Sequence, residues 1–314
     1  MLAIYYVWLT ARELGASLSG TLITTVTFGF TPLVVIHGTF VWPKLLASAF
    51  LFAPFIIYFV RPFNKIRDNT NLAIVAGVGG ALSALAHGSS LFALLAMAVT
   101  ALSFHRIASL KFVVAGIASA FTLLASWSFY QTIIDPPGNR LTKWHLAGVV
   151  PIDDRSLRET LRDEYRNISV TDAAERRIKN FSTAFPVSIQ DFRRSLTFPL
   201  SDPTARVEIG KDLRAKAFFK PPNALGTIGT IWPLILLLPL FSRFRLLIVP
   251  IVGSYFVWGA LMYDEGSMIV HQGPFWMFTA TLVLIMAVIA KRSLIIASII
   301  AALQVISTVC IFLF

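Results

Sequence analysis

The sequence predicts an all-α, polytopic membrane protein in which a polar, mainly helical insert separates two groups of membrane helices. The 314-residue chain is 56% hydrophobic and 14% charged, whereas soluble domains carry about 25% charged residues. Its mean hydropathy is +0.73. The apolar residues form long runs that leave one block polar, which divides the chain into 1–134, 135–226 and 227–314.

Nine apolar runs approach the ~20 residues that a helix needs to cross about 30 Å of hydrocarbon. They are 17–36, 43–60, 72–87, 89–104, 110–133, 228–241, 246–263, 271–290 and 293–313. Only Gly88 separates 72–87 from 89–104, so these two fit a tightly turned pair or helices buried partly in protein. Residues 1–10 lack the features of a signal peptide and are interpreted as a partial helix, either the tail of a truncated one or a poor anchor.

Loop charge predicts which helix ends face the cytoplasm, because Lys and Arg in short loops stay inside. One set of alternate loops holds ten basic residues: Arg12, Arg61, Lys65, Arg67, Arg106, Lys111, Arg243, Arg245, Lys291 and Arg292. The opposite set holds one basic residue, Lys44, together with His37, His87, Asp264, Glu265 and His271. We therefore expect the second set, and the insert with it, to lie outside the cytoplasm.

The insert is expected to be folded, because 16 basic and 12 acidic residues are mixed in it without low complexity. Leu157, Leu161 and Tyr165 recur at helical spacing, which predicts an amphipathic helix over 154–167.

Two further helices are predicted in the insert. Asp172 followed by Glu175 resembles a capping box at the start of the first. The apolar face of this helix would consist of Ile178, Phe181 and Phe185. The second is expected from about Pro203 to Phe219.

Motifs of soluble enzymes are absent from the sequence. The glycines of Gly77-Val78-Gly79-Gly80 lie inside an apolar run, where they favour helix packing over phosphate binding. No Cys/His spacing typical of a metal site occurs, and Cys310 is the single cysteine. The net charge of +11 is explained by loops facing anionic lipid. Membrane lipids are thus expected partners, and nucleic acid is not.

Four of the five histidines, His37, His87, His145 and His271, belong to the predicted outer side. A histidine at a helix end is often only an interfacial hydrogen-bonding residue, but their clustering on one side points to a binding site. Lys44 begins an apolar run. It fits either a snorkelling anchor or a cation that binds a lipid phosphate or a carboxylate.

The segment from Asp135 to Gly148 opens the insert. Its Arg140, Lys143 and His145 suit the phosphate of a lipid headgroup, and a solvated basic face explains the two cations equally well. Asp135 fits a turn. The acidic pair Asp264 and Glu265 would serve as a base or hold a divalent cation, and charge bias alone also explains it.

Several short motifs resemble polytopic glycosyltransferases of the C superfamily, which take sugars from polyprenyl-phosphate donors. They are Leu14-Gly-Ala-Ser to Pro32, Phe40-Val-Trp-Pro-Lys-Leu-Leu46, His87-Gly-Ser-Ser-Leu-Phe92, Ser126-Trp-Ser-Phe-Tyr-Gln131 and Asp135-Pro-Pro-Gly-Asn-Arg-Leu-Thr-Lys-Trp-His-Leu-Ala-Gly148. As an architecture, the likeness covers most of the chain.

The resemblance implies transfer of a glycosyl unit from a lipid-linked donor to a glycan, lipid or protein outside the cytoplasm, in the bacterial inner (plasma) membrane. Lys44, Arg140 and Lys143 would offset the charge that develops on the leaving phosphate. The acidic catalytic residue of this family lies in a long outer loop near the N-terminus, which has no counterpart before 17–36. Asp135, Asp264 and Glu265 are the substitutes.

Two other functions fit the composition. A lipid transporter predicts a central polar pathway, although charged residues are nearly absent from the apolar runs. A non-catalytic scaffold or assembly protein predicts that the insert carries the surface that binds a partner. The transferase differs from both because it requires the outer histidines and cations to converge on one cavity.

Overall fold

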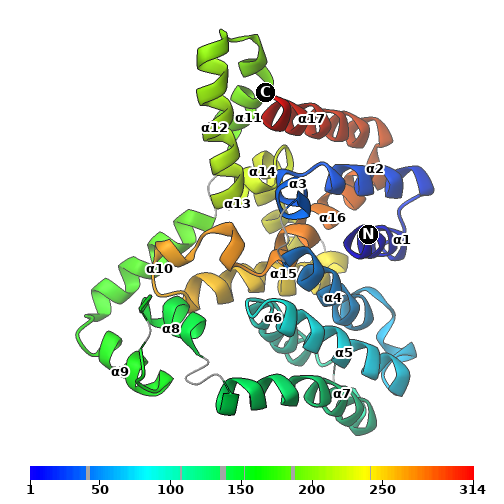
Figure 1. Ribbon diagram of the computed structural model, residues 1–314. Helices are drawn as coiled ribbons and strands as arrows, with labels where there is room; N and C mark the ends of the chain where they lie inside the picture. Colours follow the sequence, from blue (N-terminus) through cyan, green and yellow to red (C-terminus); the bar gives the residue numbers. More distant parts are fainter. Residues whose placement is uncertain (40–42, 107, 135–138, 152, 185–187, 241) are drawn as a thin grey trace.

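The computed structural model describes the chain except residues 40–42, 107, 135–138, 152, 185–187 and 241 (Figure 1). Every regular element in the described part is helical, so the predicted all-α class is confirmed. The candidate acid Asp135 lies outside the described residues.

Helices α1 to α7 precede the insert. They are α1 (Leu2–Glu13), α2 (Leu18–Gly29), α3 (Pro32–Thr39), α4 (Lys44–Phe55), α5 (Thr70–Ala86), α6 (Ser90–Ser103) and α7 (Leu110–Phe129). The helices after the insert are α13 (Pro221–Ala224), α14 (Ile228–Ile231), α15 (Ser242–Leu261), α16 (Phe275–Arg292) and α17 (Leu294–Leu313). Shorter turns include η5 (Trp232–Leu240), η6 (Glu265–Ser267) and η7 (Val270–Gln272).

Within the described residues, four helices are long and apolar enough to cross a membrane. They are Leu110–Ile134, Phe244–Leu261, Phe275–Arg292 and Leu294–Leu313. Helices α2 and α3 add a fifth if they count as one span bent by 58°. The remaining predicted runs form shorter apolar helices, such as the 14-residue α6. An integral membrane protein is therefore supported, whereas nine full spans are not confirmed.

The long apolar helices differ in what surrounds them. In α16, 78% of the apolar window is buried inside the protein, whereas the value for the helix that begins with α7 is 6%. Figure 1 shows α16 among other helices near the centre and α7 at the edge. The short helix α4 is also buried along most of its length. A helix enclosed by protein does not need the full thickness of the hydrocarbon, which explains why several predicted spans are short.

The glycines of α5 allow its neighbours to approach closely. A Cβ atom on Gly77 would lie 2.2 Å from the carbonyl oxygen of Gly116 in α7. A Cβ atom on Gly79 would lie 2.9 Å from the carbonyl oxygen of Phe50 in α4. The prediction that these glycines serve helix packing is confirmed.

The basic loops are joined at one end of the helical body. Arg61 forms an ion pair with Glu13 at 2.8 Å, and Lys291 donates a hydrogen bond to the carbonyl oxygen of Leu14. These contacts connect three loops of the predicted cytoplasmic set.

The insert contains α8 (Arg140–Ala147), α9 (Leu157–Arg166), α10 (Val170–Ala184), α11 (Ile189–Thr197) and α12 (Pro203–Phe219). Helix α12 has the predicted bounds, and α9 lies within the predicted 154–167. Ser156 and Glu159 form a capping box at the start of α9. Helices α8 and α11 were not predicted.

The start and the packed face of α10 differ from the prediction. The helix begins at Val170, where the hydroxyl of Ser169 accepts a hydrogen bond from the backbone of Asp172 at 3.0 Å. Ile178 is 67% exposed, whereas Asn180 is fully buried. The predicted apolar face is therefore wrong at Ile178, since polar contacts to α15 set the orientation of the helix. Phe185 lies outside the described residues.

The insert follows one side of the helical body and contacts it at several points (Figure 1). From α10, the Asn180 amide donates to the carbonyl oxygens of Gly259 and Met262 at the end of α15, at 2.9 Å each. On α11, the Ser195 hydroxyl lies 2.6 Å from that of Ser307 in α17. These contacts dock the insert onto the helices that follow it in the chain.

Gln304 of α17 supports the break between α2 and α3. Its amide nitrogen donates to the carbonyl oxygen of Phe30 at 3.0 Å, and its amide oxygen accepts from the backbone of Thr227 at 2.7 Å. The Thr308 hydroxyl also donates to Phe30, at 2.6 Å. A helix break at this depth is stable because side chains replace the missing backbone hydrogen bonds.

Candidate functional site

Lys44 and four histidines come together from five separate elements, and we call them the histidine cluster. His37 lies in α3, Lys44 begins α4, His87 caps the end of α5, His145 lies in α8 and His271 in η7. After burial, the positive charge of Lys44 is the next cause that lowers the pKa of His87, of His145 and of His271. The charge of Lys44 can act on these rings only if they lie near it. The four histidines of the predicted outer side are therefore close together in the structure.

Burial keeps the imidazoles of the cluster neutral. Mainly for this reason the pKa of His87 is lowered to about 3, and the pKa values of His145 and His271 to about 4. The neighbouring charges that lower them further are also cationic. An anion bound here would oppose the lowering of these pKa values, because its negative charge favours the protonated imidazole.

Lys44 is only 4% exposed and His37 only 3%. Lys44 therefore does not lie as an exposed anchor at the protein surface, which was one of its two interpretations. A charged side chain in this position needs polar or charged interaction partners, because burial disfavours the ionised form.

Aromatic rings pack against the cluster. The ring of His37 lies 4.4 Å from that of Phe275 and 6.0 Å from that of Phe218. Phe218 also lies 5.3 Å from His271. Because Phe218 belongs to α12, the end of the insert covers this part of the cluster.

A short chain of hydrogen bonds orients His87. Its Nδ1 atom lies 2.6 Å from the Ser89 hydroxyl, which lies 2.9 Å from the carbonyl oxygen of Gly273. The backbone N–H of Ser89 also donates to Nδ1, at 3.3 Å. Ser89 thus holds the imidazole through both its hydroxyl group and its backbone.

An apolar cavity of about 340 Å³ lies between α1, α2, α3 and α4. Its lining includes Gly38 and Leu45, which directly follow His37 and Lys44 in the chain. The cavity has the chemistry to hold a hydrocarbon chain. Helices α3 and α4, which carry His37 and Lys44, contribute part of its lining.

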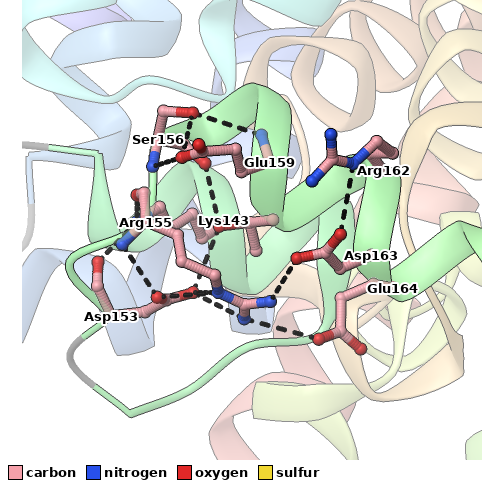
Figure 2. Close-up of polar contacts among 9 residues, drawn as sticks. Lys143, Asp153, Arg155, Ser156, Glu159, Arg162, Asp163 and Glu164 are labelled. Atoms are coloured by element: carbon pink, nitrogen blue, oxygen red, sulfur yellow. Dashed lines mark hydrogen bonds and ion pairs between the residues drawn. The ribbon is translucent and has the colours of Figure 1, made fainter.

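The other two predicted phosphate-binding cations lie in different surroundings. Lys143 is 1% exposed and donates hydrogen bonds to the carbonyl oxygens of Asp153 and Arg155 (Figure 2). Arg140 is exposed, with Nε 3.4 Å from the carbonyl oxygen of Val150. Lys143 thus supports the loop before α9, and neither side chain is brought into the histidine cluster by a described contact.

Around Lys143, Arg155 organises the charges of the insert. Its guanidinium forms ion pairs with Asp153 at 2.8 Å, with Asp163 at 3.1 Å and with Glu164 at 3.6 Å (Figure 2). The hydrogen bond from Arg155 is the largest cause that lowers the pKa of Asp153. We call Lys143 and these four residues the insert network.

The described carboxylate candidates, Asp264 and Glu265, have few polar contacts. Asp264 accepts a hydrogen bond from the backbone of Ser267 at 3.2 Å, which caps η6, and Glu265 is exposed. Among the described residues, no three His, Cys, Asp or Glu side chains are placed to hold a metal ion. Within the described residues, the site thus consists of imidazoles and Lys44, and Asp264 caps a turn.

Sequence reasoning did not assign Ser89, Phe218 or Gln272 to the site. Ser89 and Gln272 had a local signal, since they lie two residues from His87 and next to His271. Phe218 reaches the cluster only through packing between distant parts of the chain. A comparison of the chain with protein-family models, with curated proteins and with solved structures found no match.

Proposed function

We propose that the protein is a membrane glycosyltransferase that takes a hexosyl or pentosyl unit from a polyprenyl-phosphate donor and transfers it to an acceptor outside the cytoplasm. The observation that carries this proposal is the convergence of Lys44 and four histidines, two of whose helices, α3 and α4, also help to line an apolar cavity. Cation and imidazole suit a phosphate, and the cavity suits the chain attached to it. A soluble phosphate would gain nothing from the cavity.

The proposed reaction uses these groups in separate roles. An acceptor hydroxyl oxygen forms a bond to the anomeric carbon, while the bond from that carbon to the phosphate oxygen breaks and its electron pair stays on the phosphate. Lys44 offsets the charge that develops on this leaving group. The acceptor proton passes to a neutral imidazole of the cluster, for which His87 is the candidate because Ser89 orients its ring.

The binding step is tested with purified protein in lipid nanodiscs and a polyprenyl phosphate without sugar. We expect Lys44→Met to weaken binding about 10- to 100-fold, the value of a hydrogen bond to a charged group. The matched control is Lys111→Met, an exposed lysine at the other end of the helical body. Equal binding by the wild type and Lys44→Met would overturn the role of Lys44 and with it this proposal.

The transfer step is tested with radiolabelled polyprenyl phosphoglucose, phosphomannose and phosphoarabinose in membranes that contain the protein. We expect one of them to lose its label to a membrane or envelope acceptor, and Lys44→Met to abolish the transfer. A wild type that binds the phosphate but consumes none of the donors would favour the scaffold or transporter alternative.

The orientation is part of the proposal, with the insert outside the cytoplasm of a bacterial inner membrane. Single cysteines at Gly38, Gly88 and Val150 should react with an impermeant thiol reagent in whole cells, after Cys310 is replaced by serine. A cysteine at Asp68 is the control, since this exposed residue lies in a loop of the basic set. Protection of the first three together with labelling at Asp68 would reverse the orientation.

A further inference from the structure

Gln272 is a buried amide that has no hydrogen-bond partner among the described residues. The side chain is 3% exposed, and neither its nitrogen nor its oxygen forms a hydrogen bond. A buried polar group in this condition destabilises a fold, so proteins normally satisfy it with protein, water or ligand.

A second buried glutamine shows what a structural amide looks like in this protein. Gln304 is fully buried, and both ends of its amide are bonded, to Phe30, Thr308 and Thr227. Gln272 makes no comparable contact in the described structure. Stabilisation of the fold therefore explains Gln304 and leaves Gln272 unexplained.

The position of Gln272 connects it to the histidine cluster. It lies between His271, a member of the cluster, and Gly273, whose carbonyl oxygen accepts the hydrogen bond from Ser89. The indole of Trp258 packs against the same loop, since a Cβ atom on Gly273 would lie 2.9 Å from this ring. The indole N–H of Trp258 is buried and is also without a hydrogen-bond partner among the described residues.

The chemistry of the amide differs from that of the cluster. A phosphate offers acceptor oxygens, which Lys44 and the N–H groups of the imidazoles satisfy as donors. A carboxamide both donates and accepts, and so does a hydroxyl group. Gln272 is therefore matched to a neutral ligand that carries hydroxyl groups, and the Trp258 indole adds one more donor next to an aromatic ring.

We propose that Gln272 binds a hydroxyl group of the sugar that is transferred, with Trp258 as a second contact, and so selects the glycosyl unit of the donor. This inference rests on the proposed function, since it assumes a lipid-linked sugar at the histidine cluster. A site that hydrogen-bonds a hydroxyl strongly disfavours a ligand without it, because its own polar groups are then left without partners.

The experiment compares two ligands on one variant. Gln272→Met keeps the shape of the side chain and removes both polar atoms. Binding to nanodisc protein is measured for a polyprenyl phosphate and for its phosphoglucose, phosphomannose and phosphoarabinose derivatives, and the tightest of these is used. Gln190→Met, at an exposed position of α11, is the matched control.

We expect Gln272→Met to bind the polyprenyl phosphate within about twofold of the wild type and the sugar-linked lipid at least about 10-fold more weakly. The melting temperature of the ligand-free variant should rise by a few degrees, because an unsatisfied polar group is removed. A merely structural role predicts the opposite, a fall in melting temperature and equal losses for both ligands.

Each contrary result has a separate meaning. If the variant binds the sugar-linked lipid as tightly as the wild type does, Gln272 does not contact the sugar and the inference fails while the proposed function stands. If it weakens both ligands equally, Gln272 belongs to the phosphate site and the inference also fails. If the wild type binds neither ligand, the proposed function fails and this inference fails with it.

Discussion

The histidine cluster and the insert network use charge in opposite ways. In the insert network, Arg155 contacts three carboxylates, and its own pKa is raised mainly by the hydrogen bond to Asp153. In the histidine cluster, the charged neighbours that shift the imidazole pKa values are cationic, so the rings stay neutral. In the insert network, opposite charges pair with each other and stabilise the fold. In the histidine cluster, basic groups are buried together, which suits the binding of an anion.

The largest expected effect concerns Lys143, because this buried ammonium supports two carbonyl groups of the insert. We expect Lys143→Met to lower the free energy of unfolding by about 3 kcal/mol, since hydrogen bonds to charged groups contribute about 1.5–3 kcal/mol each. Thermal unfolding in detergent, together with proteolysis of the loop before α9, would measure the effect.

The control for Lys143 is Lys211→Met, because Lys211 is 63% exposed and forms an i, i+3 ion pair with Glu208. This change should alter stability by less than about 0.5 kcal/mol. A stable Lys143→Met variant that binds polyprenyl phosphate more weakly would move Lys143 from the insert network into the binding site.

The second expected effect is a loss of stability in acid that comes from the histidine cluster. The folded-state pKa values of about 3 to 4 for His87, His145 and His271 lie below the ordinary value of 6.5. The unfolded chain therefore binds more protons as the pH falls through 6.5, and stability decreases from there toward pH 4. Between pH 7 and pH 5 we expect a loss on the order of 2 kcal/mol, since solvent screens half-buried rings.

This acid effect separates the two regions. The pKa of Asp153 is lowered, so the insert network loses its contribution only when the pH falls below the ordinary range of a carboxyl group. The difference in melting temperature between pH 7 and pH 5 should therefore be smaller for a His145→Gln variant than for the wild type. Added polyprenyl phosphate should restore stability at pH 5. An equal acid loss in wild type and variant would show that other groups titrate.

The smallest expected effect concerns Arg155, because its side chain is 39% exposed. We expect Arg155→Met to lower the melting temperature less than Lys143→Met does, since exposed ion pairs contribute little each but three carboxylates share this cation. Arg162→Met, which removes a 69% exposed partner of Asp163, serves as the control and should have no measurable effect. A loss as large as that for Lys143→Met would mean that the insert network folds as one cooperative unit.

The sequence was sufficient for the broad architecture and for part of the site. Apolar runs and loop charge alone place His37, His87, His145 and His271 on one side. This follows because successive spans put successive loops on alternate sides of the membrane. The lengths of the spans were not predictable, since hydropathy does not distinguish a helix in lipid from one enclosed by protein, as α16 shows.

The roles of single polar residues were also beyond the sequence. Lys143 was expected at a lipid phosphate, and its partners are carbonyl groups 10 and 12 residues away in the chain. The Ser89 hydroxyl, which contacts His87, also donates to the carbonyl oxygen of Gly273, 184 residues away. Contacts of this kind depend on tertiary packing, which no local pattern reports.

The amide of Gln304 connects the bend between α2 and α3 to a distant part of the chain. One side chain holds Phe30 at the bend and Thr227 at the point where the chain returns from the insert. His37 follows the bend, and Phe218, which precedes the return, packs on its ring. The ring of Phe218 and the bend that Gln304 holds thus lie at the two ends of the short helix α3, which connects the cover of the site to the bent span.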